Sequence, residues 1–187
     1  KKKKKLEAAF RSVNTDDLIS AAVGGAPKLG WYKESGKALS TIFKEDTRRF
    51  ASLLAALSPQ TSVEMNLENA VNVWVNWIKS GRSKDPEEIL EIMGRSVLGD
   101  KGTDSVLNSW KNNAIRTLAK PEGALWDDFR LSGPKVDSFS YANSGDLDRV
   151  VNDAWMANLT GVPQDLFARG SGAANPGYSP GYLGASA

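Results

Sequence analysis

The sequence from Leu131 to Leu159, LSGPKVDSFSYANSGDLDRVVNDAWMANL, predicts a glycine turn, a short helix, a loop and a second helix. Gly133 lies in the turn and a proline follows at the first helical position, while Asn152 or Asp153 is suited to cap the second helix. Lys135 and Asp153 are eighteen positions apart, each at the entrance of a predicted helix. No other part of the sequence offers a comparable pair of candidate functional residues.

Each member of this pair also has an ordinary structural interpretation. A lysine at a helix N-terminus opposes the positive end of the helix dipole, which hints at a function, such as a nucleophilic amine that forms a Schiff base. The alternative for Lys135 is a surface lysine whose stem covers apolar neighbours. Asp153 can stabilise a developing sugar cation during cleavage of a glycosidic bond, or it can simply cap its helix.

Apolar residues at spacings of three and four predict helices through the rest of the chain, and no strand alternation of useful length or internal repeat is present. The fold class is therefore predicted to be all-α. A proline-bounded helix begins after Asp85, and another is capped by Asp104 or Ser105. The expected spans are 6–13, 15–22, 31–43 with an interruption or a kink near Gly36, 47–57, 63–78, 86–94 and 106–118.

The helix from Val63 should be the clearest element, with apolar residues at spacings of three and four: Val63, Leu67, Ala70, Val71, Trp74 and Ile78. The tryptophans within helical patterns are expected in the core, although Trp31 and Trp77 are the least clearly core-facing. The other tryptophans within helical patterns, which are expected in the core, are Trp74, Trp110 and Trp155.

The 187-residue chain contains neither Cys nor His. This excludes disulfides, thiolate and imidazole metal sites and serine–histidine catalysis, so any chemistry must rest on carboxylates, lysine or hydroxyls. The Glu64 and Glu68 pair is too small a ligand set for a metal site, and neither a metal nor a cofactor is expected.

The net charge of +2 includes five lysines at residues 1–5, so the remainder carries 2 − 5 = −3. The lysine run is either a solvated tail, an artefact or a nucleic-acid-binding arm. Residues 6–169 are predicted to form one helical domain. Residues 170–187 are rich in Gly, Ala, Ser and Pro and should form an irregular tail. No secretory signal or membrane-spanning stretch is visible, so we expect a protein that is neither secreted nor membrane-bound.

Two motifs together resemble the helix–hairpin–helix DNA glycosylase superfamily, which includes endonuclease III and the adenine-mismatch glycosylases. Leu57-Ser58-Pro59-Gln60-Thr61-Ser62 is similar to its LSxQT signature, and Gly133-Pro134-Lys135 with Val151-Asn152-Asp153 resembles its hairpin, lysine and catalytic aspartate at the same interval. The resemblance covers roughly residues 48–161. It implies a helical glycosylase-like fold and chemistry on a base that is flipped out of the stack.

Carried over by position, the resemblance makes Lys135 the Schiff-base lysine and Asp153 the catalytic carboxylate. Gln60 and Thr61 would face the DNA, and Ser132 and Gly133 would belong to the phosphate-binding hairpin. The sequence departs from the family pattern LPGVGxK, because Leu131 occupies the place of the first glycine and Pro134 lacks an amide donor.

The phrases SPQTSVE, GPKVDSF, NDAWMAN and PGYLG also resemble a group of uncharacterised bacteriophage proteins. The leading hypothesis is accordingly a phage-encoded glycosylase-like protein that acts on or binds a base in DNA or a nucleotide, in the host cytoplasm or the virion. The alternative is a non-catalytic nucleic-acid-binding or virion-associated protein of the same fold, with other phage proteins as partners. A third hypothesis is a helical interaction domain whose likeness to the family is accidental.

Overall fold

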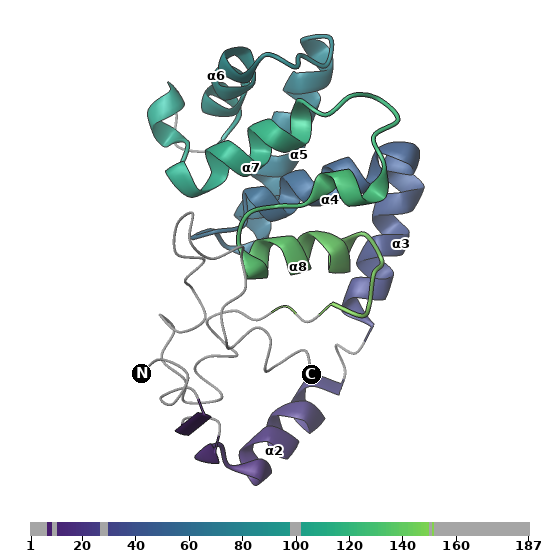
Figure 1. The fold of residues 1–187 in the computed structure, drawn as a ribbon, viewed down its shortest axis with the longest axis vertical. Coiled ribbons are helices and arrows are strands. Elements are labelled where there is room, and N and C mark those ends of the chain that lie inside the picture. The colour runs from purple at the N-terminus through teal and green to yellow at the C-terminus, as the bar shows by residue number, and fades with distance from the viewer. Residues whose placement is uncertain (1–6, 9–10, 27–29, 98–101, 150, 152–187) are drawn as a thin grey trace.

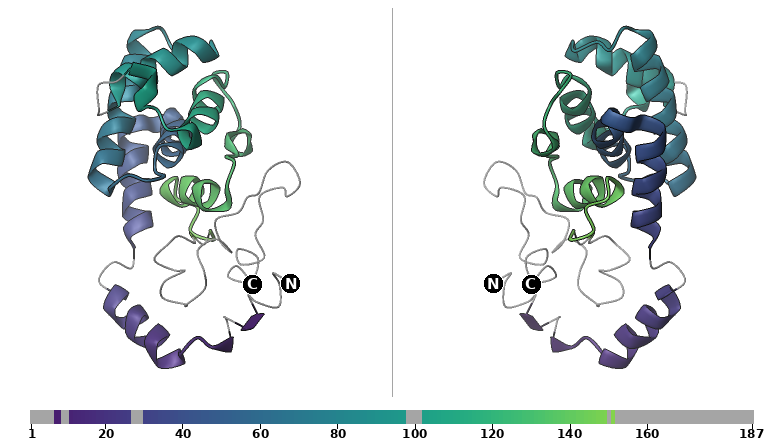
Figure 2. Two further views of the ribbon diagram at one scale, coloured as in Figure 1. Left: turned by 90° about the vertical axis from the view of Figure 1, so that its left-hand side faces the viewer. Right: turned by 90° about the vertical axis from the view of Figure 1, so that its right-hand side faces the viewer.

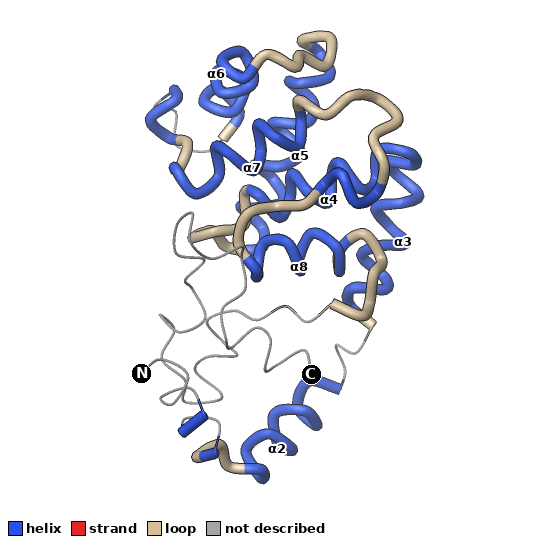
Figure 3. The backbone as a smooth tube through the Cα atoms, viewed as in Figure 1, coloured by secondary structure: helices blue, strands red, loops and turns tan. Residues whose placement is uncertain are grey.

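The computed structural model describes residues 7–8, 11–26, 30–97, 102–149 and 151. Over these residues the chain forms helices and loops and no strand, which confirms the predicted all-α class (Figure 3). The lysine run at residues 1–5, Asp153 and the tail at 170–187 lie outside the described residues.

The α-helices follow one another along the chain with short 3-10 turns between some of them (Figure 1). Their bounds are α2 Thr15–Gly25, α3 Trp31–Phe43, α4 Thr47–Ala56, α5 Val63–Lys79, α6 Pro86–Ser96, α7 Asn108–Leu118 and α8 Pro134–Asn143. The 3-10 turns are η2 Lys44–Asp46, η3 Gly102–Ser105 and η4 Trp126–Phe129. α2 buries none of its residues and lies apart from the other helices (Figures 1 and 2).

Helix α4 is the centre of the structure, because every one of its residues is buried. The predicted apolar face of Phe50, Leu53, Leu54 and Leu57 is confirmed. Phe50 stacks on Phe43 with ring centroids 3.7 Å apart, and both rings meet the Trp74 indole edge-on. Since burying one such side chain stabilises the fold by about 1.5–3 kcal/mol, this cluster is a major source of stability.

Helices α7 and α8 both run antiparallel to α4. The N-terminal end of α4 contacts the C-terminal end of α7, where Arg49 Nη1 donates to Leu118 O at 3.2 Å. It also contacts the C-terminal end of α8, where Arg48 Nη1 donates to Ser144 Oγ at 3.4 Å. The opposite end of α4 therefore faces the N-terminal ends of α7 and α8, which positions the two sequence motifs beside each other.

Arg48 ties α8 to α4 from within the protein, with only 4% of its surface exposed. Its Nη1 donates to Ser52 Oγ at 3.0 Å and also to Ser140 Oγ on α8. Its guanidinium lies 3.9 Å from the centroid of the Tyr141 ring. Burial lowers the pKa of the Arg48 guanidinium, and the hydrogen bond and charge of Tyr141 partly offset this. A charged group is accommodated here because hydroxyl and carbonyl oxygens accept its hydrogen bonds.

The predicted core face of α5 is correct for Ala70 and Trp74 and wrong for the other residues of the stripe. The buried residues of this helix are Asn66, Asn69, Ala70, Val73, Trp74 and Trp77, whereas Val63, Leu67, Val71 and Ile78 are 40–67% exposed. Trp77, which the sequence placed least clearly in the core, is 1% exposed and donates from Nε1 to Ser83 O at 2.8 Å. Both faces of α5 carry apolar residues, and Asn66 and Asn69 made the inner face look like the solvent-exposed one in the sequence.

Two further sequence predictions, one on the interior of α3 and one on the start of α7, also differ from the structure. Helix α3 continues through Gly36, and this glycine instead allows a close approach: a Cβ added there would lie 3.0 Å from the Cα of Gly145. The helix expected from Asp104 or Ser105 begins only at Asn108, because residues 102–105 form the separate turn η3. Within the described residues no helix is long and apolar enough to cross a membrane.

Candidate functional site

The segment Ser58–Ser62, here called the SPQTS turn, connects α4 to α5. Thr61 Oγ1 donates to Ser58 O at 3.1 Å, which closes the turn, and Ser62 caps α5 by accepting from Met65 N at 3.2 Å. Gln60 is exposed and has a φ of 63°, a left-handed conformation that is uncommon for a residue with a side chain. The turn therefore presents Gln60 to the surface from a fixed backbone.

Helices α7 and α8 both contact this turn. Trp110 Nε1 on α7 donates to Pro59 O at 2.9 Å. Lys135 Nζ on α8 donates to Ser58 Oγ at 3.3 Å and lies 5.2 Å from the ring centroid of Phe139. The two motifs, 77 positions apart in the sequence, thus meet in one place through a direct contact between their side chains.

The turn that precedes α8 is held by Asn113 of α7. Asn113 accepts from Ser132 N at 2.8 Å and donates to Ser132 O at 2.9 Å, so one amide side chain binds both backbone groups of one residue. Gly133 follows with a φ of 100°, which only glycine adopts without strain. Together these features set the direction in which α8 leaves the turn, and hence where Lys135 lies.

Internal contacts occupy much of the hydrogen-bonding capacity of the turn that precedes α8. Leu131 is buried and its N–H donates to Asp137 Oδ1 at 2.8 Å, while the N–H of Ser132 donates to Asn113. Asp137 in turn lies 3.2 Å from Nε of Arg130. Pro134 has no N–H. The amide of Gly133 and the Ser132 hydroxyl are the groups of this turn best suited to contact a phosphate from outside.

Of the six predicted site residues, Gln60 and Thr61 lie on the SPQTS turn, and Ser132, Gly133 and Lys135 lie at the start of α8, where Lys135 contacts Ser58 of that turn. Asp153 lies outside the described residues, so its distance from Lys135 stays a prediction. Sequence reasoning missed the roles of Ser58, Trp110 and Asn113. The sequence signal for Asn113 was misleading, because a polar residue beside Lys111 and Asn112 is typical of a solvated face.

Among the described residues, no group of three or more Asp or Glu side chains is placed to hold a metal ion. Comparison with known proteins gives no matching family model, no matching curated protein and no matching solved structure.

Proposed function

We propose that this chain is a phage-encoded protein with the helix–hairpin–helix DNA glycosylase fold, and that it acts on the N-glycosidic bond of a base in DNA or a nucleotide. The proposal rests on one observation above all. Lys135 Nζ and Ser58 Oγ are 3.3 Å apart, so the lysine motif and the SPQTS motif form one site. A contact between these two motifs is what the superfamily arrangement requires, and it supports the proposal.

The proposed chemistry uses the Lys135 amine as a nucleophile. In its deprotonated form the amine attacks C1′ of the deoxyribose, the C1′–N bond breaks, and the base leaves with the bonding electron pair and takes up a proton. The nitrogen of Lys135, after losing a proton, stays bonded to C1′. The C1′–O4′ bond then breaks, O4′ takes up a proton, and the opened sugar is joined to Lys135 as a protonated imine. Asp153, on the interval that it shares with the superfamily, would stabilise the positive charge that develops on the sugar. Gln60, exposed on the neighbouring turn, would contact the DNA.

Borohydride trapping tests this proposal. The protein is incubated with duplex and single-stranded oligonucleotides that carry an abasic site or one of a panel of modified bases, and borohydride reduces any imine to a stable covalent adduct. We expect an adduct with the natural sequence, none with Lys135→Gln, and at least a hundredfold lower base release with Asp153→Asn. The control is Lys37→Gln, an exposed lysine on α3. The catalytic proposal is abandoned if neither adduct nor base release occurs across the panel.

A non-catalytic nucleic-acid-binding or virion-associated protein is the second candidate. It is favoured by the internal use of the Leu131 and Ser132 amides and by Pro134, which together weaken the phosphate grip of a hairpin. This candidate predicts that DNA binding, measured by fluorescence anisotropy, persists without any trapping. It also predicts a fixed number of copies per particle in mass spectrometry of purified virions.

A further inference from the structure

A second polar site lies at the other end of α4 from the SPQTS turn. A cavity of about 350 Å³ opens there between the N-terminal end of α4, the loop after α5 and the loop after α7. Its wall includes Arg49, Trp77, Arg82, Lys84, Lys120 and Glu122. Arg49 and Ser58 are nine residues apart, which is roughly 14 Å along a helix axis, so this cavity is distinct from the Lys135 site.

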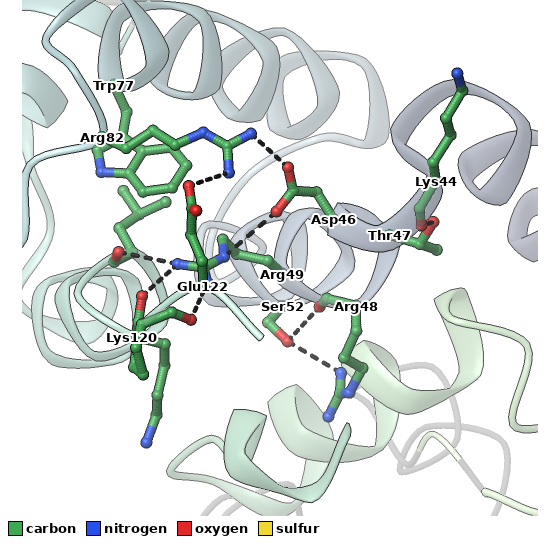
Figure 4. A network of polar contacts seen from close by, with 12 residues as sticks. Lys44, Asp46, Thr47, Arg48, Arg49, Ser52, Trp77, Arg82, Lys120 and Glu122 are labelled. Atoms are coloured by element: carbon green, nitrogen blue, oxygen red, sulfur yellow. Dashed lines mark hydrogen bonds and ion pairs between the residues drawn. The ribbon is translucent and has the colours of Figure 1, made fainter. Parts of the chain in front are cut away.

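Arg49 is a fixed cation in the wall of this cavity. Its side chain is 4% exposed, and its guanidinium donates to Lys120 O at 2.7 Å and Pro121 O at 2.7 Å (Figure 4). Its buried Nε has no hydrogen-bond acceptor within the described structure, since the nearest carboxylate oxygen, Asp46 Oδ1, is 3.7 Å away. One donor of a buried charged group thus lacks a hydrogen bond, which is unusual in a folded protein.

Arg82 supplies a second guanidinium that lies 5.5 Å from the centroid of the Trp77 ring. Its Nη2 contacts Asp46 Oδ2 at 2.6 Å, and its Nη1 is 3.4 Å from Glu122 Oε1 (Figure 4). Arg82 has a φ of 59°, a left-handed conformation that is uncommon for a residue with a side chain. Glu122 is 76% exposed, and its contact with Arg82 is long, so an external anion can displace it at little cost.

The charge of the cavity is opposite to that of the surrounding protein. Four cationic side chains and the Glu122 carboxylate line it, and Asp46 lies against both arginines, so the site has a net charge of 4 − 2 = +2, whereas the chain without its first five lysines carries 2 − 5 = −3. Within the part of the chain that the structure describes, no hydrogen bond or ion pair of the Lys84 or Lys120 ammonium groups is found. Guanidinium forks and ammonium groups around a small concave site match the geometry and charge of a phosphate group.

We propose that this cavity binds a phosphate dianion, either as inorganic phosphate or as the terminal phosphate of a small phosphomonoester such as a deoxynucleoside monophosphate. The volume lies at the low end of the range for small-molecule sites, roughly 300–1,000 Å³, and suits such a ligand. Arg82 is the guanidinium at the surface of the site, and Arg49, whose Nε is buried and whose Nη groups donate to backbone carbonyls, adds positive charge from within the wall. Lys84 and Lys120 close over the bound oxygens, and Glu122 turns outward into solvent.

Isothermal titration of the full chain with inorganic phosphate and with dAMP, in a phosphate-free buffer of low ionic strength, tests the proposal. We expect saturable binding at one site, weakened about tenfold by Lys84→Gln and about tenfold by Lys120→Gln, since each removes a charge-assisted hydrogen bond. Lys33→Gln, an exposed lysine on α3, is the matched control and should bind as the natural sequence does. Glu122→Gln should bind a few-fold more tightly, because the competing carboxylate is gone.

A second measurement locates the ligand. In ¹H–¹⁵N spectra of the arginine side chains, phosphate should shift the Nε–H resonances of Arg49 and Arg82 and leave that of Arg116 on α7 unchanged. Equal affinity for phosphate and dAMP assigns the site to the phosphate alone, and tighter binding of dAMP assigns it to a nucleotide. The proposal is overturned if neither ligand binds at millimolar concentration, or if the two lysine variants bind as well as Lys33→Gln.

Discussion

Replacing Asn113 by alanine tests whether the α7 helix sets the position of Lys135. Asn113 is 4% exposed and makes hydrogen bonds of 2.8 and 2.9 Å with the N–H and C=O of Ser132. A net hydrogen bond contributes about 0.5–1.5 kcal/mol, and a buried group left unpaired costs about 1–3 kcal/mol. Ser132 is exposed, so water can replace part of the hydrogen bonding that its backbone loses. We therefore expect the free energy of unfolding to fall by about 2 kcal/mol.

Urea unfolding followed by tryptophan fluorescence measures this change, and Asn112→Ala is the matched control. Asn112 is the preceding residue on the same helix and is exposed, so its replacement should alter the free energy of unfolding by less than about 0.5 kcal/mol. Asn113→Ala should also weaken DNA binding or trapping through Lys135 at temperatures where the variant is folded, because the turn before α8 loses its anchor. If the two variants unfold at the same urea concentration, Asn113 does not hold this turn.

Three further predictions concern the helices around α4. Gly36→Ala places a Cβ 3.0 Å from the backbone of Gly145 and should cost about 1–3 kcal/mol in urea unfolding, whereas Gly24→Ala, with nothing within 4 Å, should be neutral or stabilising. Arg48→Met leaves the hydroxyls around it, including that of Ser140, without their donor and should lower the free energy of unfolding by about 2–4 kcal/mol; a loss below about 0.5 kcal/mol contradicts this assignment. Stability should be nearly constant from pH 6 to 9, because the chain has no His. The pKa of Arg48 is lower in the folded than in the unfolded state, so the unfolded state binds the proton more tightly and stability rises with pH only in the strongly alkaline range. A clear change in the urea midpoint between pH 6 and 9 would contradict this reasoning.

Local signals were sufficient to predict the helices that have strong boundaries. Asp85 was expected to cap a helix with proline at its first position, and Asp85 Oδ1 accepts from the N–H groups of Glu87 and Glu88, both at 2.9 Å. The apolar face of α4 was also correct. These predictions succeeded because the cap and the helical period each depend on residues within a few positions of one another.

The predicted buried face was partly wrong for α5, a helix that carries apolar residues on more than one side. The choice between the two faces of α5 depends on partners distant in sequence, above all Phe43 and Phe50 against Trp74 and Arg49 against Trp77. A reading based on the apolar period alone selected the stripe through Leu67. The same limitation applies to Gly36, whose neighbour Gly145 is 109 positions away in the sequence.

The candidate site was predictable only as a list of residues. Its place at a helix entrance singled out Lys135, the family resemblance added the SPQTS segment, and the structure adds the contact between Lys135 and Ser58. It also adds the residues that hold the two parts in place, Trp110 and Asn113, which no motif identified. Positioning residues of this kind have ordinary local sequence contexts, because their role depends only on which backbone groups lie across the helix interface.

The consecutive arginines on α4 show how one helix can serve two sites. Neighbouring residues on an α-helix point about 100° apart, so Arg48 and Arg49 reach different partners from the same turn. Arg48 donates to Ser140 on α8, the helix that carries Lys135, whereas Arg49 donates to the backbone after α7 and forms the wall of the basic cavity. A charged pair in a sequence usually indicates a solvated face. Here both charges are buried because the surrounding carbonyl and hydroxyl groups accept their hydrogen bonds, and the same rigid helix therefore fixes the geometry at both of its ends.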